Sequence, residues 1–92
     1  MWDAEKNKKL KQDRGISFEE ISFYMENGHI LRIIEHPNQA KYSGQKVAFV
    51  KVRDYIYLVP YIETENYFIL KTVFPSRKAV KLYLKGDVRD EN

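Results

Sequence analysis

The order of apolar and polar positions predicts helices at the two ends of the chain and strands between them. Residues 2–26 have a helical pattern, and after Gly28 the apolar positions recur every second residue and become β-branched or aromatic. Beyond Pro75 the helical pattern returns. This order of elements is typical of an α+β domain.

The first predicted helix covers residues 2–14 and is highly charged. Asp3 can accept hydrogen bonds from the first free backbone amides, and Gly15 can adopt the positive φ that often ends a helix. Apolar side chains are few in this segment (Trp2, Ala4 and Leu10). We therefore expect the helix to lie on the surface with only a narrow stripe docked.

The second predicted helix has the clearest start signal in the chain. Ser17 and Glu20 are spaced as a capping box, in which each side chain binds the backbone N–H of the other residue. Ile16 and Ile21 flank this box at the positions of a hydrophobic staple. The helix is expected to end at Asn27 and Gly28, which favour a C-terminal stop.

Four predicted strands follow, and short segments connect them, so we expect an antiparallel meander. The strands cover residues 29–35, 46–53, 55–62 and 67–74. Ser76 is expected to cap a last helix that extends to about residue 84 and stops at Gly86. Helices segregated before and after the sheet predict that all helices pack on one sheet face and leave the other free. Residues 1–86 would form one domain, and residues 87–92 a frayed, charged tail.

Charges occur in blocks along the chain, although the net charge is only +3. Residues 16–37 carry four acids and one base, and residues 54–70 carry three acids and no base. In contrast, residues 41–53 carry four bases and residues 71–85 carry five, both without an acid. A fold that joins the basic blocks would present a positive face to a polyanion. The alternative is that scattered lysines only keep a small domain soluble.

The composition excludes several classes of site. The chain has no cysteine, so it has no disulfide, thiolate nucleophile or cysteine-based zinc site. It has no glycine-rich phosphate loop and no histidine spacing typical of a metal site, so we expect no metal and no cofactor. No apolar run has the length of a membrane span, and no apolar signal core begins the chain. We therefore expect a cytoplasmic protein.

The first candidate site is the basic segment that joins the last strand to the last helix. Arg77 has a planar guanidinium that matches a phosphate, and a helix N-terminus adds unpaired amides beside it. Cations at a helix N-terminus oppose the helix dipole, which favours a functional role over simple solvation of an exposed helix. The cations of this segment are Lys71, Arg77, Lys78, Lys81 and Lys85.

The second candidate site is the polar loop after the first strand. His36 provides an imidazole that can exchange protons near neutral pH, and Lys41 and Tyr42 follow on the same loop. Such groups can serve as general acid or base beside a phosphodiester. The alternative is an ordinary turn in which the histidine only packs.

Two further features are compatible with RNA. Tyr55, Tyr57 and Tyr61 share one face of a regular strand, where they either stack unpaired bases or pack in the core. Lys9 and Arg14 belong to a positive helix that either follows an RNA backbone or is simply solvated.

The chain resembles the BrnT-like toxins, which are small ribonuclease toxins related to the RelE and ParE group of bacterial type II toxin–antitoxin systems. The residues that carry the resemblance are Trp2-Asp3-x-x-Lys6, Gly15-Ile16-Ser17-Phe18-Glu19-Glu20 and Ser76-Arg77-x-Ala79. The chain departs from the family pattern at Leu10, where asparagine is usual, and at Asp13-Arg14, where the family has Lys-His. The strand that normally precedes Trp-Asp is reduced here to Met1.

The resemblance implies a RelE-like fold and metal-independent cleavage of RNA, in which a 2′-hydroxyl attacks the neighbouring phosphorus. It also implies a cognate antitoxin that covers the basic face. The chemistry needs cations, a base and an acid. The candidates for catalysis are Arg77, Lys71, His36 and Glu63, and those for RNA binding are Lys9, Arg14, Lys41, Tyr42, Lys78 and Lys81. Two alternatives remain: a non-catalytic module that binds RNA or a protein, and a gyrase-directed toxin of the ParE branch.

Overall fold

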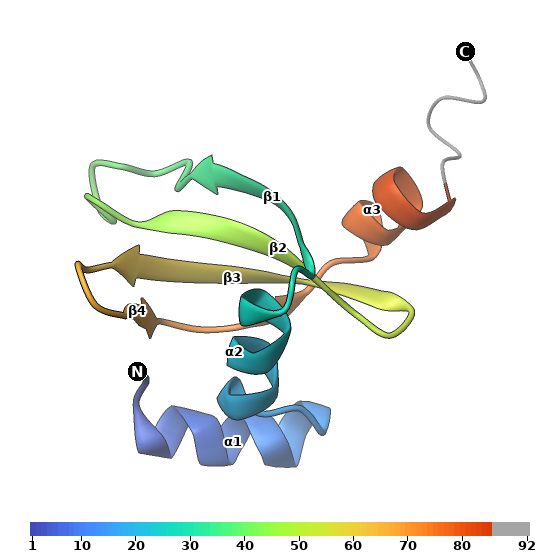
Figure 1. Ribbon diagram of the computed structural model, residues 1–92, viewed down its shortest axis with the longest axis horizontal. Helices are drawn as coiled ribbons and strands as arrows, with labels where there is room; N and C mark the ends of the chain where they lie inside the picture. Colours follow the sequence, from blue (N-terminus) through green and yellow to red (C-terminus); the bar gives the residue numbers. More distant parts are fainter. Residues whose placement is uncertain (86–92) are drawn as a thin grey trace.

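A computed structural model of the protein describes residues 1–85, and it has the predicted α+β class with an antiparallel sheet (Figure 1). The expected stop at Gly86 and the tail 87–92 lie outside the described residues. The elements follow one another as α1 (Ala4–Arg14), α2 (Phe18–Glu26), β1 (Ile30–Glu35), β2 (Lys46–Val52), β3 (Tyr55–Glu63), β4 (Phe68–Leu70), β5 (Phe74–Pro75), α3 (Arg77–Val80) and the π-helical turn η1 (Lys81–Lys85).

Helix α1 begins and ends at the predicted capping residues. The Asp3 carboxylate accepts hydrogen bonds from the backbone N–H groups of Glu5 and Lys6, and this satisfies two amides that the helix leaves free. Gly15 has a φ of 68° and ends the helix, with its N–H bound to the carbonyl of Lys11. Both signals in the sequence are therefore confirmed.

Helix α2 starts with the predicted capping box. The Ser17 hydroxyl accepts from the backbone N–H of Glu20 at 3.1 Å, and the Glu20 carboxylate accepts from the Ser17 N–H at 3.1 Å. The helix buries Phe18, Ile21 and Met25, which recur at helical spacing and form one apolar face. This face packs on the sheet and forms the main core.

Within residues 1–85 five strands form one antiparallel sheet, in the order β1-β2-β3-β4 with β5 also paired to β3. The last predicted strand is divided, because the chain leaves β3 after Leu70 and returns to it at Phe74. Lys71 lies in this gap, and its N–H still donates to the carbonyl of Pro60 at 2.9 Å. The prediction of a single strand over residues 67–74 is therefore wrong.

The helices cover both faces of the sheet, so the expectation that they share one face is wrong. Helix α2 packs with Val50 and Val59 on one face. Helix α3 packs against Ile56, whose side chain points the other way because neighbouring strand residues alternate between faces. Strand β3 is apolar at nearly every position, and α3 provides the second cover that this pattern requires.

One contact caps the last helix and another joins the C-terminal segment to the sheet. The Ser76 hydroxyl accepts from the N–H of Ala79 at 3.1 Å, so the predicted cap of the last helix is confirmed. Further along, the Arg32 guanidinium on β1 donates to the Tyr83 hydroxyl at 3.0 Å.

None of the helices within residues 1–85 combines the length and the apolar character that crossing a membrane requires.

Candidate nucleic-acid interface

Two predicted RNA-binding residues of α1 lie in one groove with the segment between β4 and β5. Lys9 and Arg14 line this groove together with Lys6, and the opposite wall is formed by residues 72–74. The Lys6 ammonium donates to the carbonyl of Lys71 at 3.3 Å, so it bridges α1 and the last strand segment. Segments that lie far apart in the sequence are therefore neighbours on the surface. We call this hollow the α1 groove; it is lined by Lys6, Lys9, Leu10, Asp13, Arg14, Phe18, Thr72, Val73 and Phe74.

The cations after β5 are exposed on α3 and η1. Arg77, Lys78 and Lys81 all project into solvent, as the sequence indicates. The helix itself is short, with four residues over Arg77–Val80, so its dipole is weak. The Ala79 amide is already bound by Ser76. One of the amides at this helix N-terminus is therefore occupied, and Arg77 offers its own guanidinium to a phosphate.

His36, Lys41 and Tyr42 come together in the loop between β1 and β2. The ring centroids of His36 and Tyr42 lie 4.3 Å apart, and the Lys41 ammonium lies 5.3 Å from the centroid of the Tyr42 ring. The Nδ1 atom of His36 accepts from the backbone N–H of Asn38 at 3.1 Å. The neutral imidazole therefore has its proton on Nε2. These contacts support both an RNA-binding loop and a packed turn.

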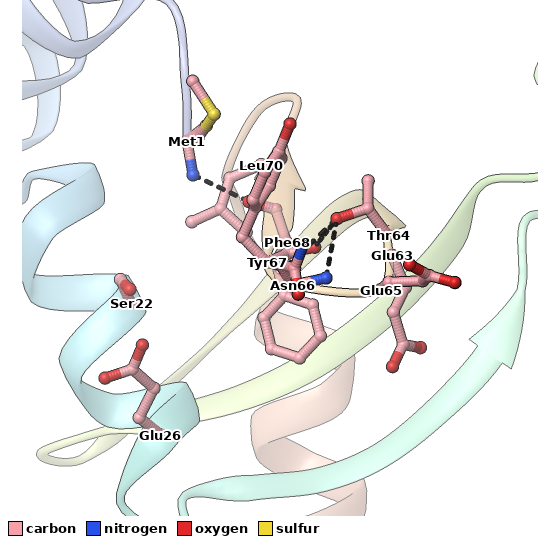
Figure 2. A pocket seen from close by; sticks show the side chains of 10 residues that line it. All are labelled: Met1, Ser22, Glu26, Glu63, Thr64, Glu65, Asn66, Tyr67, Phe68 and Leu70. Carbon is pink, nitrogen blue, oxygen red and sulfur yellow. Dashed lines mark hydrogen bonds between the residues drawn. The ribbon is translucent and has the colours of Figure 1, made fainter.

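Glu63 lies in acidic surroundings at the far end of β3. It lines a hollow together with Glu26 and Glu65, and Figure 2 shows the three carboxylates around this space. The Lys46 ammonium lies 3.8 Å from the Glu63 carboxylate, and both side chains are about half exposed. Like charges repel, so several carboxylates in one hollow disfavour an RNA phosphate there.

The structure does not bring the four candidate catalytic residues to one point. The N–H of Ser76 donates to the carbonyl of Ile56, which places Arg77 at the start of β3. The backbone N–H of His36 donates to the carbonyl of Gln45. Gln45 precedes Lys46, which pairs with Tyr61, so His36 lies at the level of Ile62 near the opposite end of β3. The six residue steps from Ile56 to Ile62 span roughly 20 Å at about 3.3 Å per residue. At this separation the side chains of Arg77 and His36 cannot both contact the same phosphate.

Lys71 and Glu63 are also separate from Arg77. Lys71 is partly buried and lies at the level of Pro60, and its backbone carbonyl accepts from the Lys6 ammonium of the α1 groove. Glu63 pairs with Phe68 at the end of β3 that lies away from α3. Two groups of cations therefore remain: the α1 groove with Lys71 beside it, and the exposed cations of α3 and η1.

The tyrosines of β3 serve mainly as packing residues. Tyr61 is 2% exposed and makes an edge contact with Phe68 at 5.2 Å between ring centroids. Tyr57 packs against the same core as α2. The interpretation of these rings as platforms for unpaired bases is therefore not supported. Phe74, the last residue of the predicted strand 67–74, is half exposed and follows the backbone segment that faces α1.

The sequence carried a partial signal for Phe74. It precedes Pro75, which has no N–H for a strand ladder and therefore favours an edge position. Its exposure depends on the gap after Leu70, which the alternating pattern does not show.

Among the described residues, no group of three or more His, Asp and Glu side chains is placed to hold a metal ion. Comparisons with protein-family models, curated proteins and solved structures found no match for this chain.

Proposed function

We propose that this protein is an RNA-directed toxin with a RelE-like arrangement of elements, which binds RNA through its basic surface and cleaves it without a metal ion. The observation that carries the proposal is the α1 groove. There Lys6, Lys9 and Arg14 of the N-terminal helix face the segment between Lys71 and Phe74. Contacts between several cations and phosphates are the main source of affinity for RNA.

The distribution of charge supports a polyanionic partner. The cations of α1 and of residues 71–81 lie along the β4–β5 edge and the segment after it. Carboxylates collect elsewhere, in the hollow formed by Glu26, Glu63 and Glu65 (Figure 2). A surface divided in this way steers a polyanion towards one face and repels it from the other.

Within this proposal, Arg77 stabilises the negative charge on the phosphate during attack by the 2′-hydroxyl, and Lys71 contacts the RNA backbone nearer to the α1 groove. His36, with Lys41 and Tyr42, forms a separate polar group that contacts the RNA some distance along its backbone. A cognate antitoxin neutralises the toxin by covering the cations of α1 and α3. The sequence resemblance and the order of helices and strands support this assignment.

A second candidate function is a non-catalytic RNA-binding module. It is favoured by the separation of His36 from Arg77, because cleavage needs a proton acceptor and donor close to the cations that hold the phosphate. The two candidates share the binding surface. They differ in whether bound RNA is cut.

The deciding experiment measures growth and RNA integrity after expression of the chain alone, and then incubates the purified protein with RNA in the presence of EDTA. We expect growth arrest and RNA fragments, which the Arg77→Ala variant reduces. A matched control is Arg53→Ala, since Arg53 is an exposed arginine on the β2–β3 turn that lies near Glu20. Its removal should leave both readouts unchanged.

The possible results separate the candidates. Replacing ribose by 2′-deoxyribose at the cut site should abolish cleavage, because the attacking hydroxyl is then absent. Salt-dependent binding with intact RNA would establish the non-catalytic module. Normal growth and no RNA binding by soluble, folded protein would contradict both candidates, and altered DNA supercoiling would instead indicate the gyrase-directed alternative.

A further inference from the structure

Strand β1 lies at one edge of the sheet and is poorly covered. It pairs with β2 on one side, and the strand order within residues 1–85 places no strand on its other side (Figure 1). Four of its six residues are apolar, yet Leu31 and Ile33 are 40% and 47% exposed. An apolar strand at an open edge is a template for another strand, because its outer backbone groups lack partners and its side chains gain from burial.

The hydrogen bonds of β1 show which of its backbone groups face outward. The N–H of His36 donates to the carbonyl of Gln45, so this pair is of the hydrogen-bonded kind. Bonded and non-bonded pairs alternate along an antiparallel ladder, so Ile34 also bonds to β2. Ile33 and Glu35 therefore point their N–H and C=O groups away from β2. Within residues 1–85 no strand and no loop provides a partner for these outer groups.

The β4 edge of the sheet, in contrast, is closed by the N-terminal segment. The Met1 ammonium donates to the carbonyl of Phe68, and the Met1 carbonyl accepts from the N–H of Leu70, both at 2.7 Å. The Lys6 ammonium then donates to the carbonyl of Lys71 at 3.3 Å. The chain therefore covers β4 with its own residues and, in the described part, leaves β1 open.

The charges of β1 complement those of a second β1. Arg32 lies in the first half of the strand and Glu35 at its end, so the strand is neutral and its two ends differ in sign. Charged residues on an edge strand usually oppose pairing. An antiparallel copy reverses the order, so the positive part of each strand lies towards the negative end of the other. A strongly acidic or basic partner strand would instead place a like charge beside Glu35 or Arg32.

Symmetry limits the registers in which two β1 strands can pair. With Ile33 opposite Ile33 of the second copy, two exposed apolar side chains cover each other on the same sheet face, and no like charges lie directly opposite. A register centred on Ile34 would place Ile33 against Glu35. One centred on Glu35 would oppose two carboxylates. The register about Ile33 is therefore the most favourable.

We propose that two copies of this chain associate through β1, which pairs antiparallel with itself about Ile33 and joins the two sheets into one. The dimer is weak, because a pair of six-residue strands buries less than the roughly 1,200–2,000 Å² of a stable interface. This self-association goes beyond the proposed function and does not depend on it. The cations along the β4–β5 edge stay uncovered in such a dimer, since they lie at the other edge of the sheet.

The test measures the molar mass of the full chain by sedimentation equilibrium over a wide range of concentration. Hydrogen exchange of single amides, followed by NMR at low and high concentration, reports the contact itself. Ile33→Lys places two ammonium groups opposite each other in the dimer, and Ile33→Glu places two carboxylates there. The matched control is Phe23→Lys, which introduces the same charge at a position of α2 that is 59% exposed. Thermal unfolding verifies that each variant is folded.

We expect the native chain to change from monomer towards dimer as its concentration rises. The amides of Ile33 and Glu35 should become protected from exchange over the same range, whereas the amide of Ile34, which bonds to β2, should be protected throughout. Each Ile33 variant alone should stay monomeric, and Phe23→Lys should associate like the native chain. An equal mixture of Ile33→Lys and Ile33→Glu should form dimers again, because opposite charges then meet at the centre of the strand pair.

Several results would overturn this proposal. They are a native chain that stays monomeric at every concentration, and a dimer that folded Ile33→Lys and Ile33→Glu both retain. A native dimer with no association in the mixture would refute the pairing about Ile33. An extended peptide bound to β1 of a monomeric native chain would assign the edge to a different partner. RNA binding and cleavage are measured separately on the native chain, so failure of the dimer leaves the proposed function unaffected.

Discussion

The side-chain oxygen of Asn7 accepts a hydrogen bond from the backbone N–H of Phe18 at 2.8 Å, and this contact joins α1 to the start of α2. The amide nitrogen of Asn7 also donates to the Glu19 carboxylate at 2.8 Å. Asn7 is 6% exposed, and with Ser17 it belongs to the few buried polar side chains among the described residues. One asparagine thus positions the basic helix that forms a wall of the α1 groove.

Replacing Asn7 by leucine should destabilise the protein by about 1–3 kcal/mol, because the buried N–H of Phe18 then has no partner. The free energy of unfolding in urea measures this change. Asn7→Asp keeps the acceptor but places a negative charge beside Glu19, so it should also destabilise the fold. Asn27→Ala is a suitable control, since Asn27 is exposed and makes only a local bond to the Phe23 carbonyl. An unchanged stability of Asn7→Leu would contradict the proposed role of this contact.

Acid should weaken the same junction. The hydrogen bond from Asn7, with help from a backbone N–H, holds the pKa of Glu19 below its ordinary value. A carboxylate with a lowered pKa in the folded state contributes stability above its unfolded pKa, and this contribution is lost as the pH falls through the folded pKa. NMR titration of Glu19 should show the lowered pKa in the native protein and a return towards the ordinary value in Asn7→Leu. Equal values in both proteins would exclude Asn7 as the cause.

Alkaline pH should destabilise the core through Tyr61. Burial raises the pKa of its phenol, and the nearby charge of Glu63 acts in the same direction. An acid whose pKa is higher in the folded state favours its neutral form there, so stability is full below the unfolded pKa and falls as the pH rises above it. Tyr61→Phe should unfold less readily than the native protein at high pH. The measurement is thermal unfolding from neutral to strongly alkaline pH, and parallel loss in both proteins would contradict the prediction.

The effects of Arg77→Ala and His36→Ala should be independent of each other. The two residues lie near opposite ends of β3, and distant sites usually contribute additively. In RNA binding, the double variant should therefore lose the product of the two single-variant factors. Affinity measured at one salt concentration for all four proteins gives the coupling energy. A strong coupling would show that both side chains meet the same phosphate, which would require the loop of residues 36–45 to move towards α3.

Much of the local structure could be read from short sequence patterns. Asp3, Gly15 and the box formed by Ser17 and Glu20 act within a few residues of the chain, so their capping geometry follows from spacing alone. The loop cluster of His36 and Tyr42 was also expected from neighbouring positions, and the rings do lie together. The α+β class follows from the change between helical and alternating patterns.

The parts of the site that depend on distant contacts could not be predicted in this way. No pattern shows that the strand stops after Leu70, which leaves residues 72–74 to form one wall of the α1 groove. The role of Asn7 is also hidden, because a polar residue in a charged helix gives no sign of burial. Even the grouping of Arg77 with His36 was reasonable from chemistry but is not formed, since β3 separates them.

The sequence by itself determined where the helices start, which segments form strands and where positive charge occurs along the chain. These properties depend on local backbone hydrogen bonds and on side-chain periodicity, which a linear pattern contains. Only the tertiary structure decided that α2 and α3 cover opposite sheet faces, and that α1 places its cations beside the segment of residues 72–74. Such neighbours are set by packing between residues that are far apart in the chain, which no local preference encodes.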